Sequence, residues 1–428
     1  MKRVWKRILV LFIALLFSVG CTQSGQTVDP AAGSTVTSET VEPTAVPTEE
    51  PTPAPTEEPT PVPTEAPGPF SADYELLWEI LETDYPYLDY LRDKGVDVDG
   101  VRETYAKLTN NAANVNAFAE IVGKVFASLK NTAHLYLVPQ SLFSDMYGYV
   151  VLSSEGKDSL FLEPWREDLM RAAEAGYYTP PKTYSSSSSA YGLFPKVTVQ
   201  YYDDCKTLCF LVPTFYPSTI ERDCDLFEKT MMQYPEAENI IFDITANSGG
   251  SDAYWRAVIV APFGQDYTFR WRNFYKDSAY NDRIVGEWFE IHNTSEAENA
   301  PAWATAYGLD KFFCSMDLEV TGREAIQSSA KRWVLVDDTV YSSSESFACF
   351  CKATGWATVV GTQTGGDGLG FDPVVRLLPD SGLLFRFSMA AGENADGTMN
   401  IEGTTPDVIL ETADVAHLLE LIRAEQTH

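Results

Sequence analysis

The chain has 428 residues and carries 61 acidic against 31 basic side chains, a formal net charge of −30. Nucleic-acid phosphates require basic surfaces, so this composition argues against nucleic acid as a partner. Only four histidines are present, and the cysteine spacings are not those of zinc sites, so we expect no metal or other cofactor. Six cysteines follow Cys21, and we assign no disulfide among them.

Residues 1–21 indicate an export signal. Basic residues open the segment, and the apolar stretch 8–17 is too short to span a membrane comfortably. The segment ends in Ser18-Val-Gly-Cys21, which resembles the lipobox of bacterial lipoproteins, with Ser18 where leucine is usual. The resemblance implies cleavage before Cys21, a lipid on its thiol, and an extracytoplasmic domain anchored in the bacterial cell envelope. An ordinary secretory signal and an uncleaved anchor are the alternatives.

A linker follows, at residues 22–69. It repeats proline, threonine and glutamate and shows no apolar periodicity, so it cannot bury a core. Proline-rich segments of this kind are disordered and extended, and act as semi-rigid spacers. Behind a lipid at Cys21, such a segment would tether a folded domain to the membrane.

Residues 70–140 are predicted to form a helical module. Apolar residues recur there at steps of three and four, and Ser71 is placed to cap the first helix. The module ends just beyond His134. A connecting region, 141–196, has a weaker pattern.

Residues 197–428 are predicted to form an α/β core, because short apolar runs alternate with helical segments. An aromatic-rich insertion, 251–331, interrupts this alternation, and a hairpin is expected at 377–387. The predicted strands are 207–213, 239–244, 333–337 and 357–361, and the predicted helices are 225–234 and 345–354.

Three features of the α/β core and the helical module could take part in catalysis. Ser342 lies where a buried strand meets a helix, a position that suits a nucleophile and equally a helix cap. His134 is the best placed of the four histidines to act as a base. The turn 247–250 (Asn-Ser-Gly-Gly) could present amides to an oxyanion or be a plain tight turn.

Four segments, in order, carry a family resemblance: residues 240–250, 334–345, 358–366 and 401–407. They resemble the signature blocks of the tail-specific (C-terminal processing) and tricorn-type serine peptidases. The resemblance implies a crotonase- or ClpP-like α/β core and hydrolysis of peptide or protein substrates. It also implies that the nucleophile is Ser342, three residues before the glutamate that closes the second block.

The family has two arrangements of the base. One branch uses a lysine after the Gly-x-x-Thr block, but Asp367 occupies that position and no lysine follows Lys352. The tricorn-type branch takes a histidine from the segment before the core, and residues 129–134 resemble that block, ending in His134. The resemblance places the acid partner of the histidine near the last block, at Glu402, with Asp407 as its competitor.

The resemblance also places the oxyanion donors at the turn of Gly249 and Gly250 and at the amide of Ser343. Ser343 and Ser344 remain rival nucleophiles because three serines adjoin. A second hypothesis is a catalytically inactive protein on the same fold that binds an apolar ligand or peptide, lined by the aromatic insertion. Those aromatic residues are otherwise ordinary core. A third hypothesis is hydrolysis of non-peptide acyl substrates.

Overall fold

The computed structural model describes residues 67–153, 163–184, 195–314, 318–320, 326, 328–368 and 372–427. The predicted signal peptide, Cys21 and nearly all of the predicted linker lie outside these residues. From Gly68 onward the described chain belongs to one densely packed unit.

The helical module is confirmed, as α2 (Ser71–Thr83), α3 (Leu88–Asp93), α4 (Val98–Thr109) and α5 (Val115–Ser128). Its apolar stripes are buried against one another, as their spacing predicts. The predicted cap is wrong: Phe70 holds the N-cap position, and the Ser71 hydroxyl donates to Asn110 Oδ1 at 2.9 Å.

The module packs against a small antiparallel sheet of β1 (Tyr136–Leu137), β13 (Leu383–Phe387) and β12 (Val374–Leu378). The predicted hairpin is therefore confirmed as β12 and β13. The connecting region adds α6 (Gln140–Tyr147), a helical turn at Gly148–Leu152 and α8 (Glu163–Ala175) beside this sheet.

The core is a six-stranded sheet in the order β15-β11-β10-β4-β3-β2. All neighbours are parallel except β2, which runs antiparallel to β3. The predicted strands are confirmed, with bounds shifted by a few residues. The strands are β2 (Thr198–Tyr202), β3 (Thr207–Leu211), β4 (Asn239–Asp243), β10 (Lys331–Val336), β11 (Thr358–Gly361) and β15 (Val408–Ile409).

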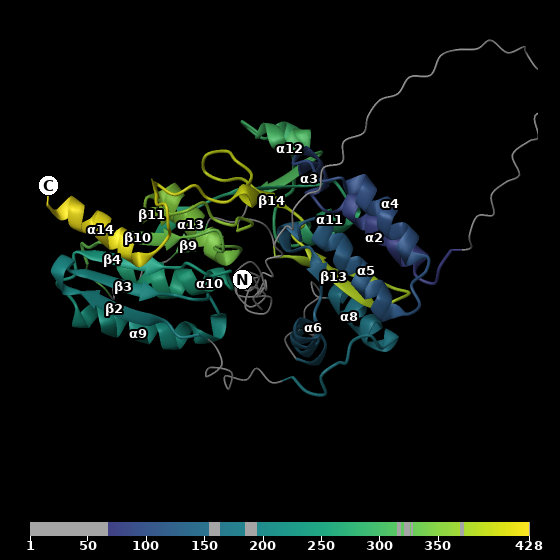
Figure 1. The fold of residues 1–428 in the computed structure, drawn as a ribbon, viewed down its shortest axis with the longest axis horizontal. Helices are drawn as coiled ribbons and strands as arrows, with labels where there is room; N and C mark the ends of the chain where they lie inside the picture. Colours follow the sequence, from purple (N-terminus) through teal and green to yellow (C-terminus); the bar gives the residue numbers. More distant parts are fainter. Residues whose placement is uncertain are drawn as a thin grey trace, which may run out of the picture. The chain divides into compact units, whose positions relative to one another are not determined.

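Helices cover both faces of this sheet (Figure 1). Because side chains alternate along a strand, Ile240 and Phe242 of β4 pack with α9 (Ile220–Gln233) and α13 (Ser343–Thr354), whereas Ile241 packs with α14 (Val415–Gln426). Cys349 and Cys351 lie buried on α13 as free thiols.

The insertion is built into the fold rather than projecting from it. Its aromatic residues Trp255, Phe274 and Tyr275 are fully buried. A four-stranded antiparallel sheet, ordered β14-β6-β8-β7, organises most of it, and a β5-β9 pair completes it. The helices and helical turns of the insertion are α10 (Asp252–Tyr254), Trp255–Val260, Ala261–Phe263, α11 (Ala279–Gly286) and α12 (Ala302–Ala306). Its strands are β5 (Tyr267–Phe269), β6 (Arg272–Tyr275), β7 (His292–Asn293), β8 (Lys311–Cys314) and β9 (Leu318–Val320). β14 (Ala391–Gly392) joins the four-stranded sheet from later in the chain.

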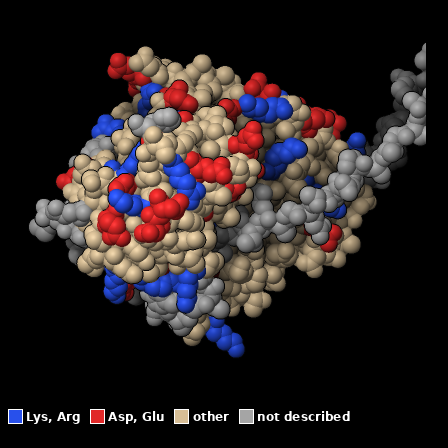
Figure 2. Space-filling model, turned by 60° about the vertical axis from the view of Figure 1, so that its left-hand side comes forward, with Lys and Arg blue, Asp and Glu red and all other residues tan. Residues whose placement is uncertain are grey.

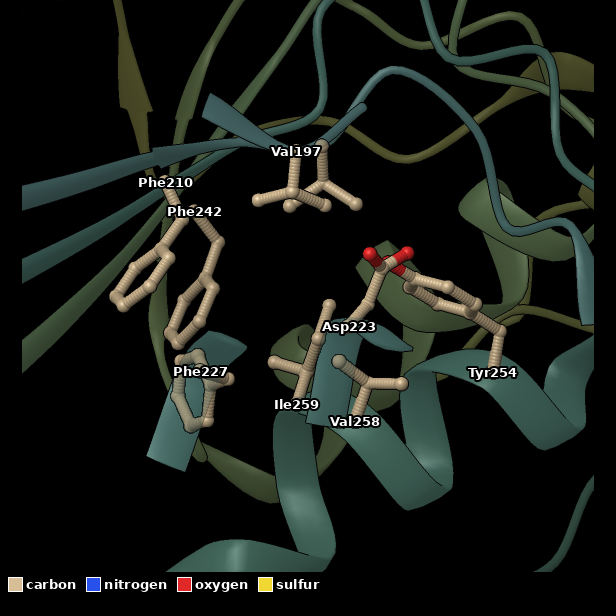
Figure 3. Close-up of a pocket in the computed structure, with 9 residues that line it drawn as sticks. Val197, Phe210, Asp223, Phe227, Phe242, Tyr254, Val258 and Ile259 are labelled. Atoms are coloured by element: carbon tan, nitrogen blue, oxygen red, sulfur yellow. The ribbon is translucent and has the colours of Figure 1, made fainter. Parts of the chain in front are cut away.

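A cavity of about 10 Å³ lies between β3, β4, α9 and the insertion (Figure 3). Phenylalanine and aliphatic side chains form most of its wall. At one side, Asp223 Oδ2 accepts hydrogen bonds from Thr219 Oγ1 and Tyr254 Oη, each at 2.8 Å. Such a space holds one water molecule at most, so it is a packing defect rather than a chamber for an apolar ligand.

The surface combines both signs of charge. On the face shown in Figure 2, basic side chains lie beside acidic ones. Exposed ion pairs such as Lys206–Glu238 and Lys331–Glu425 join separate elements of the core. No helix in the part of the chain that the structure describes combines the length and apolarity needed to cross a membrane.

Candidate active site

The site forms where β4 and β10 end. The two strands are parallel neighbours, with Leu335 opposite Asp243, so the turns that follow them emerge at the same edge of the sheet. Asn247 fixes the first turn: its Nδ2 donates to Val212 O, and its Oδ1 accepts from the Gly249 amide, both at 2.9 Å. The second turn carries Ser342.

Ser342 has the backbone of a strained strand-to-helix turn. Its φ is 58° and its ψ is −125°, a region that residues with a Cβ rarely occupy. Its N–H donates to Gly366 O at 3.1 Å, and its carbonyl accepts from Ser346 N at 2.9 Å, so backbone bonds hold the turn on both sides. The hydroxyl makes no capping hydrogen bond to α13. The alternative of a side-chain cap is thereby excluded.

Ser344 is committed to holding the turn. Its Oγ accepts from Tyr341 N at 3.1 Å and lies 2.5 Å from Asn247 O, to which it donates. Ser344 is fully buried. A hydroxyl whose proton is engaged by a backbone carbonyl is a poor nucleophile, so Ser344 ties the two turns together instead.

The glycine turn approaches Ser342 closely. A Cβ on Gly249, whose φ is 109°, would lie 2.9 Å from the Ser342 Cβ and 3.0 Å from the Ser343 amide nitrogen. The Gly249 amide itself is taken by Asn247 Oδ1, which corrects its predicted role as an oxyanion donor. Gly250 is different: its bridge with Phe215 uses the Gly249 carbonyl and the Ser251 amide, so its own N–H is not part of that pairing. Ser343 begins α13, where amides have no helical partner.

His134 closes the helical module in a strained segment. Lys130, Asn131, Ala133 and His134 all have positive φ, and such outliers cluster at functional sites. The His134 amide donates to Tyr341 Oη at 3.2 Å, and the two rings lie 5.0 Å apart. His134 is thus held against the residue before Ser342. No hydrogen bond between the Ser342 hydroxyl and the His134 ring is present among the described residues.

The carboxylate at His134 belongs to Asp367. The His134 Nδ1 lies 2.5 Å from Asp367 Oδ2, and 3.2 Å from Ser388 Oγ. The Asp367 side chain is 1% exposed. Sequence reasoning reached this position but considered it only as the place of a missing lysine. The alignment of Asp367 with that lysine is itself a signal, because a side chain at this position must face the nucleophile, whether it is the base or the partner of the base.

The predicted acid, Glu402, is wrong in this geometry. Glu402 Oε1 forms an ion pair with Lys94 Nζ at 2.7 Å, and its side chain is 40% exposed. The competitor Asp407 pairs with Lys352 at 2.7 Å and accepts from the Val359 amide at 3.0 Å. Each carboxylate is satisfied by a cation elsewhere, which leaves Asp367 as the partner of the histidine.

The buried side chain of Glu345 helps to hold the site together. It is fully buried, and this burial raises the pKa of its carboxyl. Its Oε1 accepts from Thr404 Oγ1 at 2.6 Å and its Oε2 from the Gly366 amide at 3.4 Å. The side chain therefore links α13 to the loop that carries Asp367. The described residues contain no cluster of three or more histidine, cysteine or acidic side chains suited to a metal ion.

Comparison with known proteins agrees with this geometry. Residues 212–410 match the model of peptidase family S41, and residues 70–127 match the tricorn protease C1 domain. No curated protein matches the sequence significantly.

Comparison with solved structures finds similar chains at low sequence identity. A putative peptidase from Parabacteroides merdae is 17% identical, with a TM-score of 0.50 over 83% of this chain and 93% of that one. Mature CPAF is 13% identical, with a TM-score of 0.48 over 80% of this chain and 92% of its own. The photosystem II D1 C-terminal processing protease is 17% identical, with a TM-score of 0.35 over 54% of this chain and 53% of its own.

The tricorn C1 match covers the helices that precede His134, and the S41 match covers β4, β10, β11 and β15 of the sheet together with the turn of Ser342. Residues 212–410 therefore form a peptidase family S41 domain, residues 70–127 form a domain like C1 of the tricorn protease, and the chain is a serine-type peptidase.

Proposed function

We propose that the chain hydrolyses peptide bonds with Ser342 as nucleophile, His134 as base and Asp367 as the acid that orients the base. The observation that carries this proposal is the 2.5 Å contact between His134 Nδ1 and Asp367 Oδ2. It directs the other ring nitrogen, Nε2, to proton transfer, which is the division of labour in Ser-His-Asp hydrolases.

The reaction then follows from the residues. His134 Nε2 takes the proton as Ser342 Oγ attacks the peptide carbonyl, and the amides of Gly250 and Ser343 stabilise the oxyanion. The tetrahedral intermediate breaks its C–N bond, and the imidazolium returns the proton to the leaving amine. Water, activated by the same imidazole, attacks the acyl-enzyme and releases the acid and Ser342. Contacts between nucleophile and base are often loose without substrate, which fits a base held in place from its Nδ1 side.

A serine-directed fluorophosphonate tests the nucleophile. The purified soluble domain should be labelled, and Ser342→Ala should not. Labelling that persists in Ser342→Ala would assign the reaction to another serine. A comparison of the rates at which the domain cleaves peptides and simple esters then distinguishes a peptidase from a hydrolase of other acyl groups.

Two matched variants test the acid. Asp367→Asn keeps the shape of the side chain but removes its charge, and we expect kcat to fall about 10³- to 10⁴-fold because the imidazolium loses its partner. Glu402→Gln changes an exposed carboxylate by the same chemistry and should leave kcat within about twofold. The reverse order of effects would return the acid role to Glu402.

The competing hypothesis is an inactive binding protein on the same fold. In that hypothesis the aromatic insertion lines the ligand site, whereas its residues Trp255, Phe274 and Tyr275 are fully buried core and the cavity beside α9 holds one water at most. Absence of labelling in a folded wild-type domain would favour that hypothesis.

We further propose that a lipid on Cys21 and the linker that follows it anchor the peptidase outside the cytoplasm, at the bacterial membrane. The support is the sequence of residues 1–69 alone. Full-length protein should sediment with membranes, and Cys21→Ser should release it. Equal membrane association of both forms would contradict lipid anchoring at this residue.

A further inference from the structure

Three donors converge on one carboxylate oxygen in the site. Asp367 Oδ2 accepts from His134 Nδ1 at 2.5 Å, from Tyr341 Oη at 2.8 Å and from Ser388 Oγ at 3.0 Å. The carboxylate is buried, so these donors replace the water that would otherwise solvate its charge. Their positions therefore decide where the carboxylate, and with it the imidazole, comes to rest.

Tyr341 also contacts the backbone of His134, whereas the Ser388 hydroxyl lies 3.2 Å from the imidazole Nδ1. The Tyr341 hydroxyl oxygen accepts from the His134 amide at 3.2 Å while its proton goes to Asp367. A single hydroxyl thus joins the backbone of the base to the acid that orients it. Its ring also packs against the imidazole, with 5.0 Å between centroids.

Tyr341 is also covalently next to the nucleophile. Its amide donates to Ser344 Oγ and its carbonyl lies 2.8 Å from the same oxygen, so the turn that presents Ser342 is rigid around it. His134 comes from a segment more than 200 positions earlier in the chain. The Tyr341 side chain links the segment of His134 directly to the turn of Ser342.

From this geometry we infer that Tyr341 is a positioning residue, which sets the imidazole of His134 and the carboxylate of Asp367 in register with Ser342. The inference rests on the proposed function. Burial and the adjacent carboxylate raise the pKa of Tyr341 well above its ordinary value, so the hydroxyl keeps its proton and remains a donor at neutral pH.

The test compares two buried tyrosines. Tyr341→Phe removes the shared hydroxyl, and Tyr178→Phe removes a hydroxyl that donates to Val138 O at 2.9 Å, away from Asp367. We expect Tyr341→Phe to lower kcat by about 10- to 100-fold with KM unchanged, since small displacements of a base have effects of that size. Tyr178→Phe should stay within twofold of wild type.

The pH profile provides a readout that a purely structural role would not move. Without the Tyr341 donor, the Asp367 charge acts more fully on the imidazole and favours its protonated form. The acid limb of kcat/KM against pH should therefore move to higher pH in Tyr341→Phe and remain in place in Tyr178→Phe.

The outcomes are distinguishable. A folded wild-type domain that fluorophosphonate does not label overturns the proposed function itself. A labelled wild type, with Tyr341→Phe matching Tyr178→Phe in kcat and in its acid limb, overturns the role of Tyr341 alone. If Tyr341→Phe does not fold, Tyr341→Met removes the hydroxyl at the same position with a flexible side chain. A lower kcat with the acid limb at higher pH supports the inference, and an unchanged kcat and limb overturn it.

Discussion

Replacing the strained Ser342 with glycine should stabilise the fold while removing the nucleophile. The φ of 58° and ψ of −125° lie in a region where a Cβ costs about 1–3 kcal/mol. Glycine avoids this cost but loses more chain entropy on folding, about 0.5–1 kcal/mol relative to alanine. We therefore expect Ser342→Gly to be more stable than Ser342→Ala, by up to about 2.5 kcal/mol.

The two variants are compared by equilibrium unfolding in urea. Both lack the hydroxyl, so their difference isolates the backbone. Ser144 in α6 provides the control pair, because it lies in an ordinary helix and its hydroxyl bonds to Gln140 O at 2.9 Å. There, glycine should be less stable than alanine by about 1 kcal/mol. If glycine is the less stable residue at Ser342 as well, the turn is not strained and the reasoning fails.

Three further predictions concern neighbouring groups. Gly249→Ala places a Cβ 2.9 Å from that of Ser342, so fluorophosphonate labelling should slow at least tenfold, and an unchanged rate would refute this close approach. Burial raises the pKa of Asp168 from 3.8 to about 6, so the folded state holds this proton more tightly than the unfolded state and its stability falls as pH rises from about 4 to about 6. Asp168→Asn should remove that fall and raise the free energy of unfolding at pH 7 by less than about 3 kcal/mol, because the carboxyl is partly exposed. Urea unfolding of the wild type and the variant at pH 4 and at pH 7 measures this difference. Lys94→Ala breaks an exposed pair with Glu402 and should cost less than about 1 kcal/mol with labelling within twofold; a tenfold loss of labelling would contradict a surface role for Glu402.

The sequence predicted the parts of this molecule that depend on local pattern. Short apolar runs predicted the strands of the core, because strands covered on both faces are apolar at consecutive positions, and helical spacing predicted the helical module. The turn of Ser342 was found because its residues sit between a strand and a helix. The cap at Ser71 failed because a neighbouring side chain, Asn110, competes for its hydroxyl.

The acid partner required long-range information. Asp367 meets His134 only because the loop after β11 and the end of the helical module converge, and no spacing in the chain states this. Glu402 was favoured because it lies at the expected distance along the sequence, but Lys94 from the module neutralises it. The hydrogen bond from the Gly249 amide to Asn247 Oδ1 was likewise not predictable from the sequence, and it leaves Gly250 rather than Gly249 as the candidate oxyanion donor of the turn.

The contact between His134 and Asp367 joins residues 233 positions apart and makes hydrolysis contingent on complete assembly. A core folded without the docked helical module has a serine, an oxyanion turn and a carboxylate, yet no base. With this arrangement, a nascent or half-folded chain cannot digest itself. Two separately expressed fragments, divided between α8 and β2 so that His134 lies in one and Ser342 in the other, should each be inert and recover turnover only on recombination, so catalysis itself reports on docking of the module.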